Sequence, residues 1–119
     1  MIRNFERATA DWPDERVRVE RFIAQKFAVD PDAKPYTIAL ARSQAEVPVR
    51  AGQSMLAALQ EFGIAVPTSC CGGICSACKV GWLDGKPVHG DRILSRYERE
   101  RYLMVCVAGS DSGRLVLDL

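Results

Sequence analysis

Four of the five cysteines lie between residues 70 and 78, and their spacing is the feature of this sequence that could do chemistry. Cys70 and Cys75 are separated by four residues, Cys75 and Cys78 by two, and Cys106 follows after a further twenty-seven. Thiolates are nucleophiles and ligands for soft metals. In a reducing compartment, such a cluster is typical of a metal or catalytic site rather than of a disulfide framework.

The pattern C-x4-C-x2-C with a distant fourth cysteine is the plant-type [2Fe–2S] spacing. Two irons bridged by two sulfides need two thiolates each, so a short loop supplies three of them only if it folds around the cluster. The fourth must then come from another part of the fold. Loop amides directed at sulfur would stabilise the added electron. The predicted ligands of the cluster are Cys70, Cys75, Cys78 and Cys106.

Other uses of the cysteines remain as alternatives. A ligand set with Cys71 in place of Cys70 would change the first spacing to C-x3-C, so we interpret Cys71 as a free thiol that points away from the cluster. Four cysteines could hold a structural zinc ion, although zinc sites prefer paired C-x2-4-C knuckles and Cys106 has no neighbour of this kind. A thioredoxin-like redox pair would need a βαβ context, which the glycine-containing loop lacks. His89 is the only histidine, which excludes a Rieske cluster because that cluster needs two.

A hairpin and a helix are predicted before the cysteine loop. Residues 36–41 have strand-like spacing, and residues 46–50 are the expected partner, with Pro48 favouring a sheet edge. Ser54 is suited to cap the following helix and Gly63 to stop it. The apolar face of that helix repeats at helical spacing over Met55, Leu56, Leu59 and Phe62.

The segments after the loop are predicted to complete a mixed sheet. A strand is expected over residues 80–83, and Asp84-Gly85 is typical of a tight turn. A short surface helix is expected over residues 95–103, followed by strands over 104–107 and 115–119. This order predicts an α+β domain in which a mixed sheet clasps one main helix.

The first third of the chain has a different character. A short helix is predicted over residues 2–10 and a half-exposed strand over residues 17–22. Residues 28–35 contain two prolines and two aspartates, which is typical of a linker. We therefore expect an N-terminal arm over residues 1–33 and a compact domain over residues 34–119.

Composition narrows the class of protein further. The 119 residues suit one domain, and the net charge of +1 gives no basic excess for nucleic acid or a membrane surface. No apolar stretch approaches the roughly eighteen residues of a membrane span, and the N-terminus lacks the apolar core of a signal peptide. We expect a cytoplasmic protein that is monomeric in isolation and has neither nucleic acid nor membrane as a partner.

Residues 36–119 resemble a plant-type [2Fe–2S] ferredoxin domain through six motif residues, Cys70, Gly73, Cys75, Ser76, Cys78 and Cys106. Two stretches, PTSCCGGICSACKVGWLDGKPVHGDRIL and MVCVAGSDSGRLVLDL, are most similar to the C-terminal ferredoxin domain of phthalate dioxygenase reductase-like proteins, the reductases of Rieske oxygenases. The stretch ATADWPDERVRVERFIA resembles the end of the reductase module that precedes this domain.

The resemblance implies a β-grasp fold and one-electron transfer through a [2Fe–2S] cluster, from a flavin reductase module in the same or a separate chain to a terminal oxygenase of the Rieske type. FMN and NAD(P)H would be bound by that module and not by this chain, and residues 1–33 would be a remnant of the module. The chain is then an electron-transfer component that is not catalytic alone. The alternative function is a free-standing ferredoxin that serves another acceptor, such as a cytochrome P450.

Overall fold

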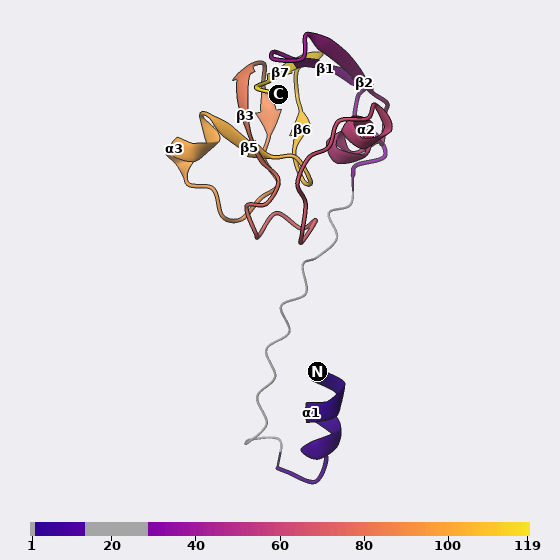
Figure 1. Ribbon diagram of the computed structural model, residues 1–119, viewed down its shortest axis with the longest axis vertical. Coiled ribbons are helices and arrows are strands. Elements are labelled where there is room, and N and C mark those ends of the chain that lie inside the picture. Colours follow the sequence, from indigo (N-terminus) through magenta and orange to yellow (C-terminus); the bar gives the residue numbers. More distant parts are fainter. Residues whose placement is uncertain (1, 14–28) are drawn as a thin grey trace.

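The computed structural model of the chain describes residues 2–13 and 29–119 (Figure 1). The predicted first helix is confirmed as α1 (Ile2–Ala8). The strand predicted over residues 17–22 lies outside the described residues. Residues 29–35 form neither helix nor strand, as their composition predicted. Among the described residues, no helix has the length and apolar character that crossing a membrane requires.

Residues 36–119 form a five-stranded mixed sheet, a two-stranded sheet and two helices. The elements are β1 (Tyr36–Leu40), β2 (Ala45–Val49), α2 (Met55–Glu61), β3 (Lys79–Asp84), β4 (Pro87–Val88), α3 (Arg96–Arg99), β5 (Tyr102–Met104), β6 (Gly109–Ser110) and β7 (Arg114–Leu117). The strand order is β2-β1-β7-β3-β5 in the large sheet, and β4 pairs with β6. Only the β1–β7 pairing is parallel among these described strands. This mixed sheet with one main helix is the predicted α+β, β-grasp architecture.

The predicted hairpin is confirmed at the sheet edge. β1 and β2 pair antiparallel, with Tyr36 opposite Val49. Side chains on β2 alternate, so that Val47 and Val49 face the core while Pro48 is exposed. Because β2 is an edge strand, the N–H that Pro48 lacks costs the sheet no hydrogen bond on its open side.

Helix α2 begins and ends as predicted, but one residue of its apolar face was assigned wrongly. The Ser54 hydroxyl accepts a hydrogen bond from the Ala57 amide at 3.1 Å, which caps the helix. Met55 and Leu59 are fully buried. Phe62, expected on the same face, is instead 49% exposed, because it is the C-cap residue and Ile64, beyond the following turn, packs against the core.

The predictions after β3 were partly wrong. The helix expected over residues 95–103 is only the four-residue α3, and the strand expected over 104–107 begins earlier, as β5. The charged run looked helical, but β5 pairs antiparallel with β3, which buries Leu103 completely. Residues 105–107 form a turn and not a strand. Tertiary pairing therefore overrode the local pattern, and strands β4 and β6 were not foreseen.

The turn expected at Asp84-Gly85 is present as a bend at Gly85. This residue has φ +108°, and a Cβ placed on it would lie 2.6 Å from the Arg114 carbonyl oxygen. Glycine is needed here both for the backbone conformation and for the close approach of β7. In Figure 1 the segment between α2 and β3, which carries four cysteines, extends below the sheet.

Candidate iron–sulfur site

The cysteine loop, residues 69–78, has no helix or strand and uses an unusual backbone conformation. Cys71, Gly73 and Ser76 have φ of 51°, 71° and 61°. Positive φ is uncommon for residues other than glycine and is typical of strained functional loops. Left-handed residues among right-handed ones turn successive N–H groups toward a common point, as in the backbone nests that bind anions and Fe–S clusters.

Cys70 and Cys75 form what we call the outer pair, at the solvent side of the loop. The Cys70 N–H lies 3.5 Å from Cys75 Sγ, and the Gly72 N–H donates to Cys70 Sγ at 3.3 Å. Cys75 is exposed and Cys70 partly exposed. The amides of Gly72 and Ile74 lower the pKa of the Cys70 thiol to about 7, so this sulfur is prepared to bind metal as a thiolate.

Cys78 and Cys106 form the inner pair, which is buried. Their Sγ atoms lie 3.1 Å apart, longer than the about 2.05 Å of a disulfide bond. Burial, together with the neighbouring Cys78 thiol, raises the pKa of Cys106, and the Gly73 amide opposes that rise. A second buried thiol this close disfavours the thiolate of Cys106, and a metal cation between the two sulfurs would balance that negative charge.

The two pairs lie near one another. Gly73, in the loop between Cys70 and Cys75, packs against the residue after Cys106, because a Cβ on it would lie 2.8 Å from Val107 Cγ2. Over residues 2–13 and 29–119, no three His, Cys, Asp or Glu side chains gather closely enough to hold a single metal ion. Two pairs suit a centre with two metal atoms, each taking two thiolates, better than one zinc ion, which needs three or four ligands at one point.

The cysteine that was set aside, Cys71, lies beside the outer pair in sequence. Its side chain is exposed, and its backbone is left-handed, with φ 51°. The structure thus brings the four predicted ligands into two pairs, and the interpretation of Cys71 as a free thiol stays a prediction.

Gly73 has contacts that sequence reasoning did not foresee. A Cβ on this residue would lie 2.8 Å from Val107 Cγ2 and 3.0 Å from Asp91 Cα. The Gly73 carbonyl also accepts a hydrogen bond from the Arg92 N–H at 3.3 Å. The loop is therefore clamped by the segment that precedes α3. The only signal in the sequence was the glycine itself, since nothing local predicts the burial of Asp91.

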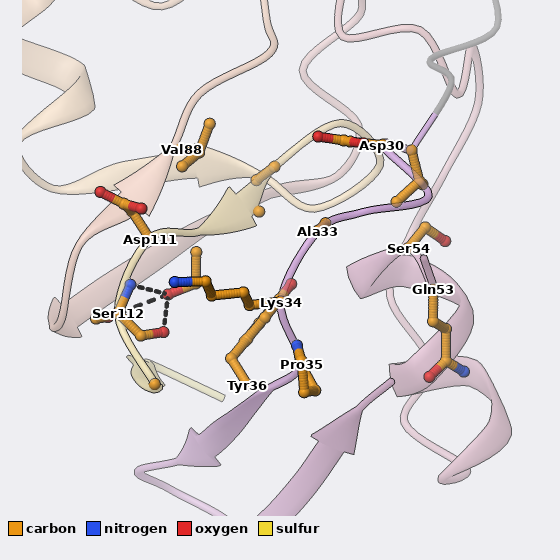
Figure 2. A pocket seen from close by; sticks show the side chains of 15 residues that line it. Asp30, Ala33, Lys34, Pro35, Tyr36, Gln53, Ser54, Val88, Asp111 and Ser112 are labelled. Atoms are coloured by element: carbon orange, nitrogen blue, oxygen red, sulfur yellow. Dashed lines mark hydrogen bonds between the residues drawn. The ribbon is translucent and has the colours of Figure 1, made fainter. Parts of the chain in front are cut away.

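A cavity of about 430 Å³ lies elsewhere in the domain. Side chains from residues 29–36, from the start of α2 and from the segment 108–113 face it (Figure 2). No cysteine lines it, so this cavity is separate from the paired thiols.

Comparison with known proteins assigns the family. Residues 38–109 match the model of the 2Fe-2S iron-sulfur cluster binding domain. The chain is 39% identical over 121 residues to phenoxybenzoate dioxygenase subunit beta of Ectopseudomonas oleovorans, covering all of this chain and 37% of that protein. It therefore spans little more than a third of the length of this curated relative.

Two solved structures extend the comparison. Phthalate dioxygenase reductase, described as a modular structure for electron transfer from pyridine nucleotides to [2Fe–2S], matches with a TM-score of 0.73 and 33% identity over 99% of this chain and 36% of its own. An intact type IV self-sufficient cytochrome P450 monooxygenase matches with a TM-score of 0.75 and 35% identity over 99% of this chain and 16% of its own. The predicted resemblance is confirmed. The chain belongs to the 2Fe-2S iron-sulfur cluster binding domain family, within the ferredoxin domains of phthalate dioxygenase reductase-like proteins, and its cofactor is a [2Fe–2S] cluster.

Proposed function

We propose that the outer pair, Cys70 and Cys75, holds one iron of the cluster and that the inner pair, Cys78 and Cys106, holds the other. The pairing of the four thiols carries this proposal, because a two-iron centre needs two thiolates on each metal. The remaining cysteine, Cys71, is not a ligand. When bound, the cluster supplies a centre that accepts and releases one electron.

The residues around the thiols have separate tasks in this proposal. The amide N–H groups at Gly72 and Ile74 favour negative charge on Cys70, and the Gly73 amide does the same for Cys106. Such donors stabilise the additional electron. Burial of the inner pair excludes water, while the exposed outer pair leaves a rim through which an electron can enter and leave.

The proposed role of the chain is to pass single electrons from a flavin- and NAD(P)H-dependent reductase module to a Rieske-type oxygenase. Support comes from the relatives, one of which is a dioxygenase subunit and another a reductase that moves electrons from pyridine nucleotides to [2Fe–2S]. This chain makes and breaks no substrate bond. Because a tight interface would slow turnover of an electron carrier, the docking it needs is weak and transient.

A second candidate acceptor is a cytochrome P450. The likeness to a self-sufficient P450 monooxygenase, at 35% identity over nearly the whole of this chain, supports it. Both candidates use the same four cysteines, so they differ only in the partner that meets the exposed rim.

Residues 34–119 are proposed to hold the cluster without the arm. All four proposed ligands lie beyond residue 34. Residues 29–33 contribute to a wall of the cavity, and Pro31 lies 3.6 Å from the Cβ position of Gly52, so this part of the arm touches the domain. A shortened chain that begins at Ala33 is expected to bind the cluster with a lower thermal midpoint. If the shortened chain fails to fold, the N-terminal boundary of the domain lies before residue 33.

Metal analysis tests the site assignment. The purified chain is expected to contain two irons and two acid-labile sulfides and to be red-brown. One zinc per chain with no visible absorption would contradict the assignment.

Electron flow tests the partners. NAD(P)H alone should not reduce the chain, whereas NAD(P)H with a phthalate dioxygenase reductase-type flavin module should. A reduced sample is then mixed in a stopped-flow instrument with a Rieske oxygenase or with a cytochrome P450. Rapid reoxidation by the Rieske oxygenase is the expected result. Reoxidation by the P450 alone would favour the second candidate and leave the cluster assignment intact.

A further inference from the structure

Asp91 is a buried acid with no task in the function proposed above. Its side chain is 0% exposed, and with Thr9 it is one of two buried polar residues in the described part of the chain. Burying a carboxyl group is costly unless its oxygens are hydrogen-bonded. The buried side-chain atoms without a hydrogen-bond partner, over the described residues, are His89 Nδ1, Asp91 Oδ1 and Arg99 Nε, all in one cluster. Because burying polar atoms without hydrogen bonds costs stability, their concentration in one cluster suggests a function there.

One oxygen of this acid organises the segment before α3. Asp91 Oδ2 accepts a hydrogen bond from the Leu94 N–H at 2.9 Å, which closes a tight turn. Arg99 Nη2 donates to the Asp91 carbonyl at 2.9 Å and lies 3.5 Å from Oδ2. The acid thus fixes residues 91–94 and connects them to α3.

The fixed segment supports the cysteine loop through Gly73. Asp91 Cα is close enough that only glycine fits opposite it, and the neighbouring Arg92 N–H donates to the Gly73 carbonyl at 3.3 Å. Gly73 directly follows Gly72, whose N–H donates to Cys70 Sγ at 3.3 Å. A series of contacts therefore runs from a buried carboxyl oxygen, through two backbone segments, to the sulfur of a proposed ligand.

We propose that Asp91 is a positioning residue that sets the reduction potential of the cluster, because it holds Gly73 and, with it, the neighbouring Gly72 N–H that donates to Cys70 Sγ. The inference rests on the proposed role of Cys70 as a ligand. An N–H donated to sulfur stabilises the additional electron, so loss of that donor makes the centre harder to reduce. The negative charge of Asp91 acts in the opposite sense, since a nearby anion disfavours an added electron.

Two uncharged variants separate the two effects. Asp91→Asn keeps an oxygen that can accept the Leu94 N–H, whereas Asp91→Leu has a similar shape and keeps none. The asparagine side chain carries no charge, so D91N should be reduced as easily as the wild-type chain or more easily. D91L should have a lower potential than D91N by about tenfold in the reduction equilibrium constant, or about 59 mV for one electron. Because neither variant is charged, their difference reports positioning alone.

The measurement is a redox titration of the whole chain, followed by its visible spectrum, with iron content and thermal midpoint recorded for each variant. Glu46→Gln and Glu46→Leu form the matched control pair, because Glu46 is an exposed acid on β2 that pairs with Arg114 at 3.1 Å. The control variants should share one potential.

Equal potentials for D91N and D91L would overturn the inference. Loss of the cluster from D91L alone, with the sheet still folded by far-ultraviolet circular dichroism, would support it in a stronger form. A wild-type chain without iron and sulfide would instead contradict the proposed function, so the two failures are distinguishable.

Discussion

The two cysteine pairs are held by different parts of the structure. The outer pair depends on a loop whose left-handed residues direct amides at sulfur, and it is open to solvent. The inner pair depends on the sheet. Cys78 directly precedes β3 and Cys106 follows β5, and Lys79 lies opposite Met104 where these strands pair. The Val105 N–H also donates to the Cys78 carbonyl at 3.1 Å.

This difference separates local from long-range control of the site. The outer sulfurs come together because of backbone conformation within ten residues of sequence. The inner sulfurs belong to residues 28 apart and meet only when β3 and β5 pair. Changes to the outer pair should therefore affect the cluster alone, whereas changes to the inner pair should affect the cluster and the fold.

The largest effect is expected from serine substitutions in the two pairs. Serine in place of any proposed ligand should abolish or alter the visible spectrum. This holds for Cys70→Ser and Cys75→Ser in the outer pair and for Cys78→Ser and Cys106→Ser in the inner pair. In addition, the inner substitutions place a hydroxyl in a buried site, which costs about 1–3 kcal/mol of unfolding free energy in the metal-free protein. Outer substitutions should change it by less than about 0.5 kcal/mol. Urea unfolding of the metal-free variants measures the loss of unfolding free energy for each pair. Equal losses for the inner and outer variants would contradict the proposed difference between the pairs.

Gly73→Ala tests the contact between loop and fold. The added methyl group would lie 2.8 Å from Val107 Cγ2, so the loop or its neighbour must move. We expect a loss of about 1–3 kcal/mol in stability and a lower iron content. Gly113→Ala is the matched control, because nothing lies within 4 Å of its Cβ position, and it should leave both quantities unchanged. Normal iron content in G73A would show that the clamp is not needed.

A smaller effect is expected where the inner side of the site meets α3. Lys79, the residue after Cys78, pairs with Glu98 at 2.9 Å. The hydrogen bond from the Ser95 N–H, and to a smaller extent the contact with Lys79, lower the pKa of Glu98 to about 2. A lowered pKa stabilises the fold fully above the ordinary value of 4.5, and this contribution declines below that pH and is lost as pH falls through about 2. Glu98→Gln should slightly lower the thermal midpoint at pH 7, and the difference from wild type should shrink toward pH 3. A difference that grows in acid would contradict this assignment.

The smallest effect is expected at Cys71. Because the x4 spacing and the pairing with Cys75 both involve Cys70, Cys71→Ser should leave the visible spectrum, the iron content and the reduction potential unchanged. Cys70→Ser is the comparison. Opposite results for the two variants would reassign the ligand in the outer pair to Cys71.

Much of this structure could be predicted from short stretches of sequence. The Ser54 cap, the hairpin of β1 with β2 and the glycine at residue 85 depend on residues close together in the chain, so their local chemistry was sufficient. Tyr102 and Leu103 were wrongly assigned to a helix, because their charged neighbours have a helical pattern while their structure depends on pairing with a strand more than twenty residues away.

The chemistry of the site follows from the types of its residues and their spacing along the chain. Cysteine is the residue that binds this kind of cluster, and the C-x4-C-x2-C spacing is a covalent property of the chain that identifies it before any folding. Three features depend instead on folding: how the thiols pair, the lack of space for a side chain at Gly73, and the burial of the acid at residue 91 behind the loop. These features arise from contacts between segments that are distant in sequence, so no local pattern of residues encodes them.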